Sequence, residues 1–371
     1  MRIVMFYHSL LSDWNHGNAH FLRGVVSELL SRGHDVAVYE PRDSWSFNNL
    51  VLEHGYGPVD ELLLVFPWLR SNRYELEKLD LDRVLDGAGM VIVHEWNSPE
   101  LIRRAGEYRK SNRGFRLFFH DTHHRSVTSP FEMEAFDLSG YDGVLAFGET
   151  VKDIYLRRGW AERAWTWHEA ADTRVFYPTE RMEPDGDLVW IGNWGDGERT
   201  REIDEFITGP ARSLGLRARL HGVRYPSEAV SVLESAGIEY GGWVPNYAVP
   251  EVYARHKFTM HVPRRPYAES LPGIPTIRVF EALACGMPLL SAPWEDSERL
   301  FSPGKDFLVA RNGEEARRAM RDLANDPSMR RELASNGLGA IEKRHTCAHR
   351  VDELLGIYAG LNMVHPGGAW A

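Results

Sequence analysis

The chain has little cysteine and no long apolar run. Cys285 and Cys347 are its only cysteines in 371 residues, too few for a disulfide scaffold, and such a chain fits a reducing compartment. No apolar stretch approaches the roughly 20 residues that a membrane-spanning helix needs, and the N-terminal residues lack the pattern of a signal peptide. We therefore expect a cytoplasmic protein without a transmembrane segment.

The chain is also short of positive charge. Its 43 Lys and Arg residues face 53 Asp and Glu residues, which gives a net charge of −10 and argues against nucleic acid as a partner. The sequence has no internal repeat, and the spacing of its first glycine loop does not fit a dinucleotide fingerprint. A chain of this length is long for one core, so two domains are expected.

Alternating strand and helix patterns fill the first half of the chain. Arg2–His8 reads as a strand, the apolar spacing over Ala19–Arg32 predicts a helix, and Asp35–Glu40 reads as a second strand. This order predicts a Rossmann-like domain over residues 1–172. Further strands are expected at Leu62–Phe66, Met90–His94, Phe115–His120, Gly143–Phe147 and Ala164–His168.

A second alternating series follows a boundary rich in proline, charge and turn-forming residues, which we interpret as a linker over residues 173–186. The second domain is expected over residues 187–345, and a last helix and tail over 346–371, with the tail from Asn362 disordered. Strands are expected at Leu188–Ile191, Arg217–His221, Glu239–Val244, Phe258–Val262, Pro288–Ala292 and Asp306–Ala310.

The stretch Lys257–Asp296 has the layout of a βαβ unit that can bind an anion. A Pro/Gly loop, Leu271–Thr276, leads into a predicted helix at Ile277–Cys285, and the free N–H groups of a helix start suit a phosphate. Glu281 follows one turn later, where its carboxylate can accept two hydrogen bonds from a ribose diol. The alternative is a plain crossover in which Glu281 is solvated or paired with an arginine.

The run TIRVFEALACGMPLLSAPWED, residues 276–296, resembles the C-terminal donor motif of retaining GT-B glycosyltransferases of the family 4-like kind, and is most similar to the CgeB-like group. The resemblance implies an α/β fold of two Rossmann-like domains facing across a cleft, with a C-terminal helix crossing back to the first. It also implies a hexosyltransferase-like enzyme that moves a sugar, with retention and without metal, from a UDP-linked donor to a small-molecule, glycan or lipid acceptor. The donor would be a co-substrate, and no other cofactor is implied.

The resemblance carries donor-binding roles onto named positions in the second domain. Glu281 would hold the ribose and Arg199 the diphosphate. The family has a second basic residue at the position of Asn193, and Arg201 or Arg264 could take its role here. Many relatives carry a glutamate eight positions before Glu281, where this chain has Gly273, so the choice of donor and the activity itself stay open. The remaining expected donor contacts are Ile274, Pro275 and Thr276 for phosphate or sugar, and Trp243 and Val244 for the base.

The first domain supplies the expected catalytic residues. The predicted strand that ends at His120 is followed by Asp121, and ligands bind beyond the carboxyl ends of parallel strands. The resemblance makes His120 the histidine that meets the donor sugar, with Asp121 a second candidate. A metal site in this HDTHH run is the alternative, as is a purely structural His120. Gly17 and Asn18 match the family's cleft loop, although Asn18 can equally be an ordinary helix N-cap.

Two other functions remain compatible with the sequence. A nucleotide-sugar 2-epimerase of the same fold is one, although that chemistry uses several carboxylates and Gly273 removes one of them. A non-catalytic two-domain sugar-binding protein is the other, and a set of basic residues directed at phosphate argues against it.

Overall fold

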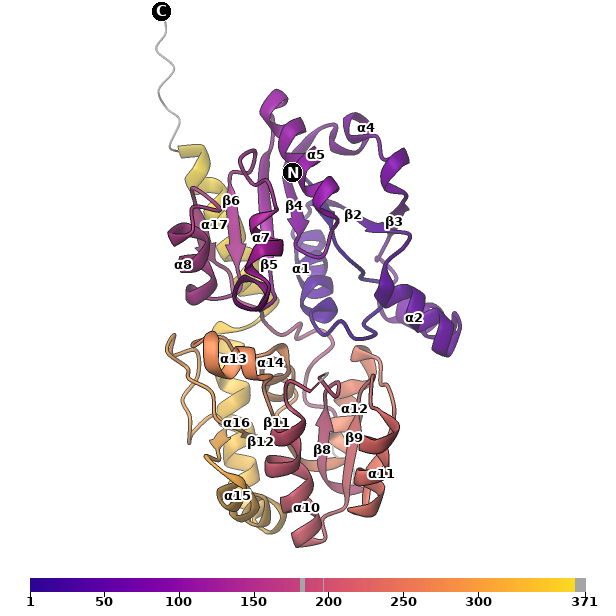
Figure 1. The fold of residues 1–371 in the computed structure, drawn as a ribbon, viewed down its shortest axis with the longest axis vertical. Helices are drawn as coiled ribbons and strands as arrows, with labels where there is room; N and C mark the ends of the chain where they lie inside the picture. The colour runs from indigo at the N-terminus through magenta and orange to yellow at the C-terminus, as the bar shows by residue number, and fades with distance from the viewer. Residues whose placement is uncertain (181–183, 196, 364–371) are drawn as a thin grey trace, which may run out of the picture.

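The computed structural model describes residues 1–180, 184–195 and 197–363. Two parallel β-sheets, each with helices on its faces, form two domains that lie one above the other (Figure 1). The expected α/β class, with two Rossmann-like domains, is confirmed. Among the described residues, no helix combines the length and apolar content needed to cross a membrane.

The first sheet has the strand order β3-β2-β1-β4-β5-β6-β7, and all its pairs are parallel. Its strands are β1 (Arg2–Phe6), β2 (Asp35–Pro41), β3 (Ser71–Tyr74), β4 (Ala88–His94), β5 (Arg116–Asp121), β6 (Gly143–Ala146) and β7 (Ala164–Thr166). Its helices are α1 (Ala19–Ser31), α2 (Trp45–His54), α3 (Gly57–Val65), α4 (Leu81–Leu85), α5 (Pro99–Ser111), α6 (Arg125–Thr128), α7 (Pro130–Glu134) and α8 (Glu149–Arg157), with a 3₁₀ turn at Leu76–Lys78.

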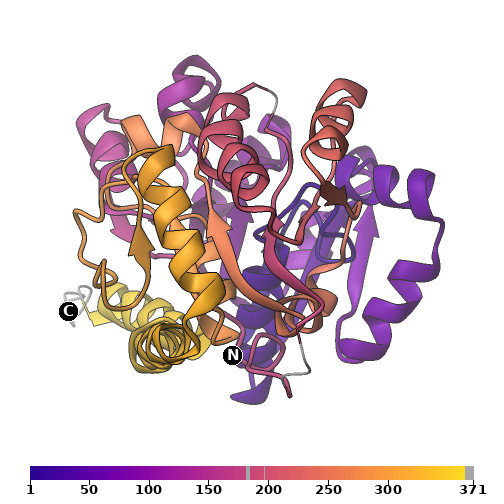
Figure 2. The ribbon, with the colours of Figure 1, turned by 90° about the horizontal axis from the view of Figure 1, so that it is seen from below.

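The second sheet has the order β10-β9-β8-β11-β12-β13 and is also parallel. Its strands are β8 (Gly186–Ile191), β9 (Ala218–His221), β10 (Ile238–Tyr240), β11 (His256–His261), β12 (Leu289–Ser291) and β13 (Leu308–Val309). The helices that follow β8 along the chain are α9 (Thr200–Ile203), α10 (Gly209–Leu214), α11 (Ser227–Ser235), α12 (Val249–Ala254), α13 (Arg265–Ser270), α14 (Ile277–Ala284), α15 (Gly313–Asn325), α16 (Pro327–Arg344) and α17 (Cys347–Met363). A π-helical segment at Asp204–Thr208 joins α9 to α10, and a 3₁₀ turn covers Asn246–Ala248. Viewed from below, the helices lie on both sides of this sheet (Figure 2).

Alternate residues of the central strands face different cores. In β1, Ile3 and Met5 pack in one buried cluster, whereas Val4 and Phe6 pack in another. Strands buried on both faces read as continuous apolar runs, which is why these central strands are recognisable in the sequence. The same division in β8 gives the second domain its two helical layers.

The last helix returns to the first domain, as expected. α17 packs along α1, and Figure 1 shows it rising beside the first domain. Where it starts, Cys347 N–H donates to the carbonyl of Ala171 at 3.0 Å. A Cβ atom at Gly24 of α1 would lie 2.4 Å from the Cys347 sulfur, so glycine permits this close approach. The expected tail falls largely outside the described residues.

One predicted strand is wrong. Leu62–Phe66 lies mostly within helix α3 (Gly57–Val65), which begins with Pro58 in its first turn. Proline is favoured at that position of a helix, and the apolar run after it lacks the alternation of a strand. Leu62 is buried, whereas Leu64 is 81% exposed, so the run is one partly buried helix face.

Candidate functional site

A cavity lies between the two domains. Its volume is about 760 Å³, and it is lined by segments that follow the carboxyl ends of strands in both sheets, where ligands bind in open α/β folds. The first domain contributes Trp14–Asn18, Trp45, Asn49, Trp96, Thr122–His124, Phe147 and Glu169. The second contributes Gly192, Asn193, Glu198, Arg199, Arg224, Arg264, Tyr267 and Thr276–Arg278.

Two arginines of the second domain are held in place on the cavity wall. Arg199 donates from Nη1 to the carbonyl of Val262 at 2.9 Å and also to the carbonyl of Asn193. Burial and the neighbouring charge of Arg264 lower the pKa of Arg199. Arg264 pairs with Glu198 at 3.1 Å. Arg199 is thus a buried cation whose hydrogen bonds go to carbonyl groups, and a bound anion would offset the cost of desolvating it.

A third arginine reaches the cavity from the start of α14. Arg278 lines the cavity and pairs with Glu281 on the next turn of the helix. The Glu281 carboxylate is fully buried and also lies 2.8 Å from Nδ1 of His20, a residue of α1. Burial raises its pKa, but Arg278 and His20 outweigh that effect and hold the pKa of Glu281 below its usual value. Glu281 does not itself line the cavity, so the structure places it behind Arg278.

The loop before α14 is only partly available to a ligand. Gly273 N–H donates to the carbonyl of Glu295 at 2.6 Å, and Ile274 N–H to that of Leu271 at 3.3 Å. These two donors are therefore already paired, contrary to the expectation that they face phosphate or sugar. Neither they nor Pro275 line the cavity, whereas Thr276 does.

Gly273 has a backbone conformation that favours glycine. Its φ is +89°, and a Cβ atom there would lie 2.5 Å from Cγ of Glu298. Glu298 accepts from Glu149 N–H at 2.8 Å and lies 2.6 Å from Nε2 of His168, so its carboxylate joins the two domains at this point. The space that a glutamate at position 273 would need is occupied by this contact.

The two expected catalytic residues lie beneath the cavity. His120 is fully buried against Trp167, with ring centroids 4.7 Å apart, and burial lowers its pKa to about 3. Asp121 accepts from Tyr155 Oη at 2.8 Å and from His123 N–H at 3.0 Å. Strand β5 continues through both residues, so their backbones belong to the sheet, and the cavity begins only at Thr122.

The histidines that follow the strand do reach the cavity. His123 and His124 line it with their rings 4.0 Å apart. Nδ1 of His124 lies 2.9 Å from Thr128 Oγ1, and burial lowers the pKa of His124 to about 4. Within the described ranges, no three His, Cys, Asp or Glu side chains are grouped so that they could hold a metal ion.

Two further polar side chains on the cavity were not singled out from the sequence. His16 and Glu169 both line it, are 5% and 4% exposed, and have Nε2 and Oε1 respectively without a hydrogen-bond partner. Burial lowers the pKa of His16, and burial together with nearby Glu281 raises the pKa of Glu169. His16 lies in the same loop as Gly17, and Glu169 directly follows the last predicted strand of the first domain, so both could have been found by position.

The cleft loop and the expected base contacts meet at the interdomain boundary. Gly17 lies against α14, because a Cβ atom there would be 3.2 Å from Cγ2 of Ile277. Asn18 does not cap α1 with its side chain, which donates instead to the carbonyl of Thr122 at 3.4 Å. Trp243 and Val244 line a small adjoining cavity, and Asn193 lines both cavities.

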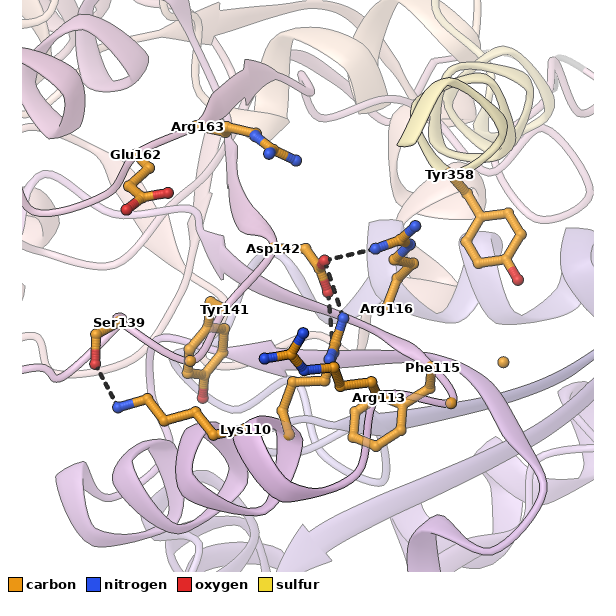
Figure 3. Close-up of a pocket in the computed structure, with 14 residues that line it drawn as sticks. Lys110, Arg113, Phe115, Arg116, Ser139, Tyr141, Asp142, Glu162, Arg163 and Tyr358 are labelled. Carbon is orange, nitrogen blue, oxygen red and sulfur yellow. Dashed lines mark hydrogen bonds and ion pairs between the residues drawn. The ribbon is translucent and has the colours of Figure 1, made fainter. Parts of the chain in front are cut away.

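A separate cavity of about 450 Å³ lies at the amino-terminal ends of strands in the first sheet. Figure 3 shows Asp142 facing Arg116 there, and Lys110 beside Ser139. It lies where β5 and β6 begin, away from the carboxyl ends of the strands. It is therefore not part of the interdomain site.

A family model matches part of the chain. Residues 199–356 match a family model described as "Glycosyl transferase-like". A search of curated proteins finds no match.

Solved structures resemble the chain over nearly its whole length. Sucrose-phosphate synthase (tll1590) from Thermosynechococcus elongatus is 14% identical, with a TM-score of 0.68, and the match covers 98% of this chain and 100% of that one. Anabaena Alr3699/HepE in complex with UDP and glucose is 13% identical, with a TM-score of 0.67 and coverage of 97% and 100%. An alpha-glucosyltransferase in complex with UDP-glucose and DNA containing an abasic site is 12% identical, with a TM-score of 0.70 and coverage of 97% and 99%.

Proposed function

We propose that this protein transfers a sugar from a UDP-linked donor to an acceptor. The chain has the two-domain GT-B fold of glycosyltransferases, and residues 199–356 match a glycosyl transferase-like family model. The interdomain cavity of about 760 Å³ lies within the roughly 300–1,000 Å³ range of small-molecule sites. Two of the similar structures, Anabaena Alr3699/HepE with UDP and glucose and the alpha-glucosyltransferase with UDP-glucose, support the choice of uridine as the base.

The observation that carries the proposal is that three of the four arginines lining the cavity, Arg199, Arg264 and Arg278, are fixed in place by groups of the second domain. Each is already oriented by a carbonyl or a carboxylate of the second domain. Cations fixed in advance stabilise the charge that develops on a departing diphosphate without reorganising during the reaction. The start of α14 adds free N–H groups beside Arg278.

We assign Glu281 a positioning role in place of direct ribose binding. Its buried carboxylate is held by His20 and Arg278, and this pairing directs the Arg278 guanidinium toward the diphosphate. Trp243, Val244 and Asn193, which line the small adjoining cavity, are proposed to flank the uracil and its ribose.

The sugar is proposed to lie toward the first domain, against Glu169 and His16. Glu169 has an unpartnered, buried carboxyl oxygen, which suits a hydrogen bond from a sugar hydroxyl. In the transfer, the bond between the anomeric carbon and the phosphate oxygen breaks, and the acceptor oxygen bonds to that carbon. The acceptor proton passes to the departing phosphate, which permits retention, while neutral His16 orients the acceptor hydroxyl.

We propose that arginine side chains, and not a metal ion, neutralise the charge of the departing diphosphate. Activity is therefore expected to persist in EDTA.

We also propose that the protein is cytoplasmic. Both cysteines are buried and unpaired, which fits a reducing compartment.

Thermal unfolding with UDP, GDP, ADP, TDP and NAD tests the donor site. A ligand at about 100 times its Kd stabilises the protein by about 2.7 kcal/mol, so UDP is expected to raise the midpoint while NAD does not. UDP-glucose and other UDP-sugars would then be assayed for release of UDP. The proposal fails if no diphosphate stabilises the folded wild-type protein.

A further inference from the structure

A side cavity of about 450 Å³ extends the proposed active site into the first domain. It lies beyond the carboxyl ends of β1, β2, β3 and β4, and it shares two lining residues, Trp45 and Trp96, with the interdomain cavity. The two spaces therefore adjoin at a pair of indoles. A molecule whose reacting end lies in the interdomain cavity can continue past these indoles into the side cavity.

The two indoles present half-buried aromatic surface at the junction. Their ring centroids are 6.2 Å apart and their planes meet at 77°, so they form a corner. His8 packs against Trp45 at 4.6 Å, and the guanidinium of Arg125 covers Trp96 at 4.3 Å. Both rings are thus fixed by neighbours of the first domain, and a rigid aromatic corner costs little conformational entropy when a ligand binds.

The charge of the side cavity restricts what it can hold. One arginine, Arg42, and three carboxylates, those of Asp43, Glu75 and Glu77, line it. Glu75 lies 3.9 Å from Arg42 and also pairs with Lys78 outside the lining. With His8 neutral the lining has a net charge of −2. Such a lining repels phosphates, so it opposes a nucleic-acid backbone or a phosphorylated acceptor.

The other polar groups suit an uncharged ligand with many hydroxyls. Carboxylates and the exposed Ser98 accept hydrogen bonds from hydroxyl groups, while flat indole faces contact the C–H faces of a sugar ring. A purely apolar ligand would leave these carboxylates desolvated without partners, which is costly.

We propose that the acceptor is a neutral saccharide of at least two units. Its reactive hydroxyl lies in the interdomain cavity, and its remaining units cross the corner formed by Trp45 and Trp96 into the side cavity. This inference rests on the proposed sugar transfer, because that reaction defines which end of the ligand reacts.

Calorimetric titration tests the inference directly. Wild-type protein, with and without saturating UDP, would be titrated with glucose, galactose and mannose, with their neutral di- and trisaccharides, and with a short DNA duplex. At least one di- or trisaccharide is expected to bind about tenfold more tightly than its monosaccharide, and Trp45→Ala and Trp96→Ala are each expected to abolish that difference. Trp45→Phe and Trp96→Phe should keep part of it.

Trp160→Ala is the matched control, because Trp160 is a half-buried tryptophan of the same domain that lines neither cavity. The inference is overturned if the longer saccharides bind no better than monosaccharides, if the Trp45 and Trp96 variants bind them like wild type, or if only the DNA binds. Stabilisation by UDP is recorded for every variant. If wild type does not bind UDP, the proposed sugar transfer is contradicted. If wild type binds UDP but no saccharide, only the proposed saccharide acceptor is contradicted.

Discussion

Arg278 and Glu281 lie one turn apart on α14 and share an ion pair across the border of the cavity. The carboxylate of Glu281 is fully buried, whereas the side chain of Arg278 is 23% exposed and lines the cavity. His20 of the first domain contacts the other oxygen of Glu281. One pair thus connects the first domain, the helix start and the proposed diphosphate site.

Glu281→Gln should weaken UDP binding by about tenfold while the protein stays folded, because the amide keeps the shape but loses the charge that orients Arg278. Titrations with UDP, 2′-deoxy-UDP and inorganic pyrophosphate separate the two possible roles. A positioning role predicts that the variant loses affinity for all three. Arg265→Ala is the control, since Arg265 pairs with Glu202 and does not line the cavity.

A different result would restore direct ribose binding. In that case wild type would prefer UDP over 2′-deoxy-UDP, the preference would vanish in Glu281→Gln, and pyrophosphate binding would not change.

Glu169→Gln should lower kcat by about tenfold, because an amide replaces the carboxyl group that is proposed to bind the sugar hydroxyl, while making the free protein more stable at alkaline pH. Burial and Glu281 raise the pKa of Glu169, so the folded state holds this proton more tightly than the unfolded state does. Wild-type stability therefore falls as pH rises from the ordinary glutamate pKa of about 4.5 through the raised one, by about 1.4 kcal/mol for each pH unit that separates the two pKa values. Glutamine avoids this cost.

Unfolding midpoints of wild type and Glu169→Gln at pH 4 and pH 8 check the stability effect. The two proteins should agree at pH 4, where both side chains are neutral, and differ at pH 8. Equal midpoints at both values, or full activity of the variant, would contradict the role given to Glu169.

The sequence predicted the sheets more reliably than the site. Strands such as β1 and β8 are continuous apolar runs because both faces of their sheets are covered, and this pattern is local. β5 is also buried on both faces, so its residue pattern does not show whether His120 or the histidines after it reach the cavity. That depends on where the sheet stops pairing, which is one residue beyond His120.

The burial and pairing of Glu281 could not be predicted from the sequence either, because its partner His20 belongs to the other domain. The helix, its glycine end and its glutamate were readable from local spacing. Which group the carboxylate contacts depends on how two domains pack, and no spacing within α14 reports that.

Gly273→Glu should destabilise the protein by about 2 kcal/mol or more and should not improve donor binding. Position 273 has φ +89°, and a side chain there would meet Glu298, so backbone strain adds to a clash at the contact between Glu298 and His168. Gly304→Glu is the matched control, because φ there is +85° with nothing within 4 Å. Denaturant unfolding should show the larger loss at position 273, and equal losses would mean that the clash contributes nothing.

His16→Ala should lower turnover, whereas His120→Phe should leave it nearly unchanged. His16 lines the cavity, whereas His120, whose ring nitrogens also lack hydrogen-bond partners, is enclosed by Trp167 and His94. Removal of His16 should lower kcat by about 10² with the fold retained, and His120→Phe should keep near wild-type kcat. Release of UDP from the donor measures both. A large loss of kcat in well-folded His120→Phe would return the catalytic role to His120.

The histidines that the structure buries in neutral form should each lower stability on mild acidification. Burial lowers the pKa of His16, His94 and His120, so below the ordinary histidine pKa of about 6.5 the unfolded chain takes up protons that the folded chain refuses. Each such group then costs about 1.4 kcal/mol of stability per pH unit until its lowered pKa is reached. Between pH 7 and pH 5, the unfolding midpoint of His120→Phe should therefore rise relative to that of wild type. An unchanged slope in that variant would mean that His120 already takes up its proton in the folded protein.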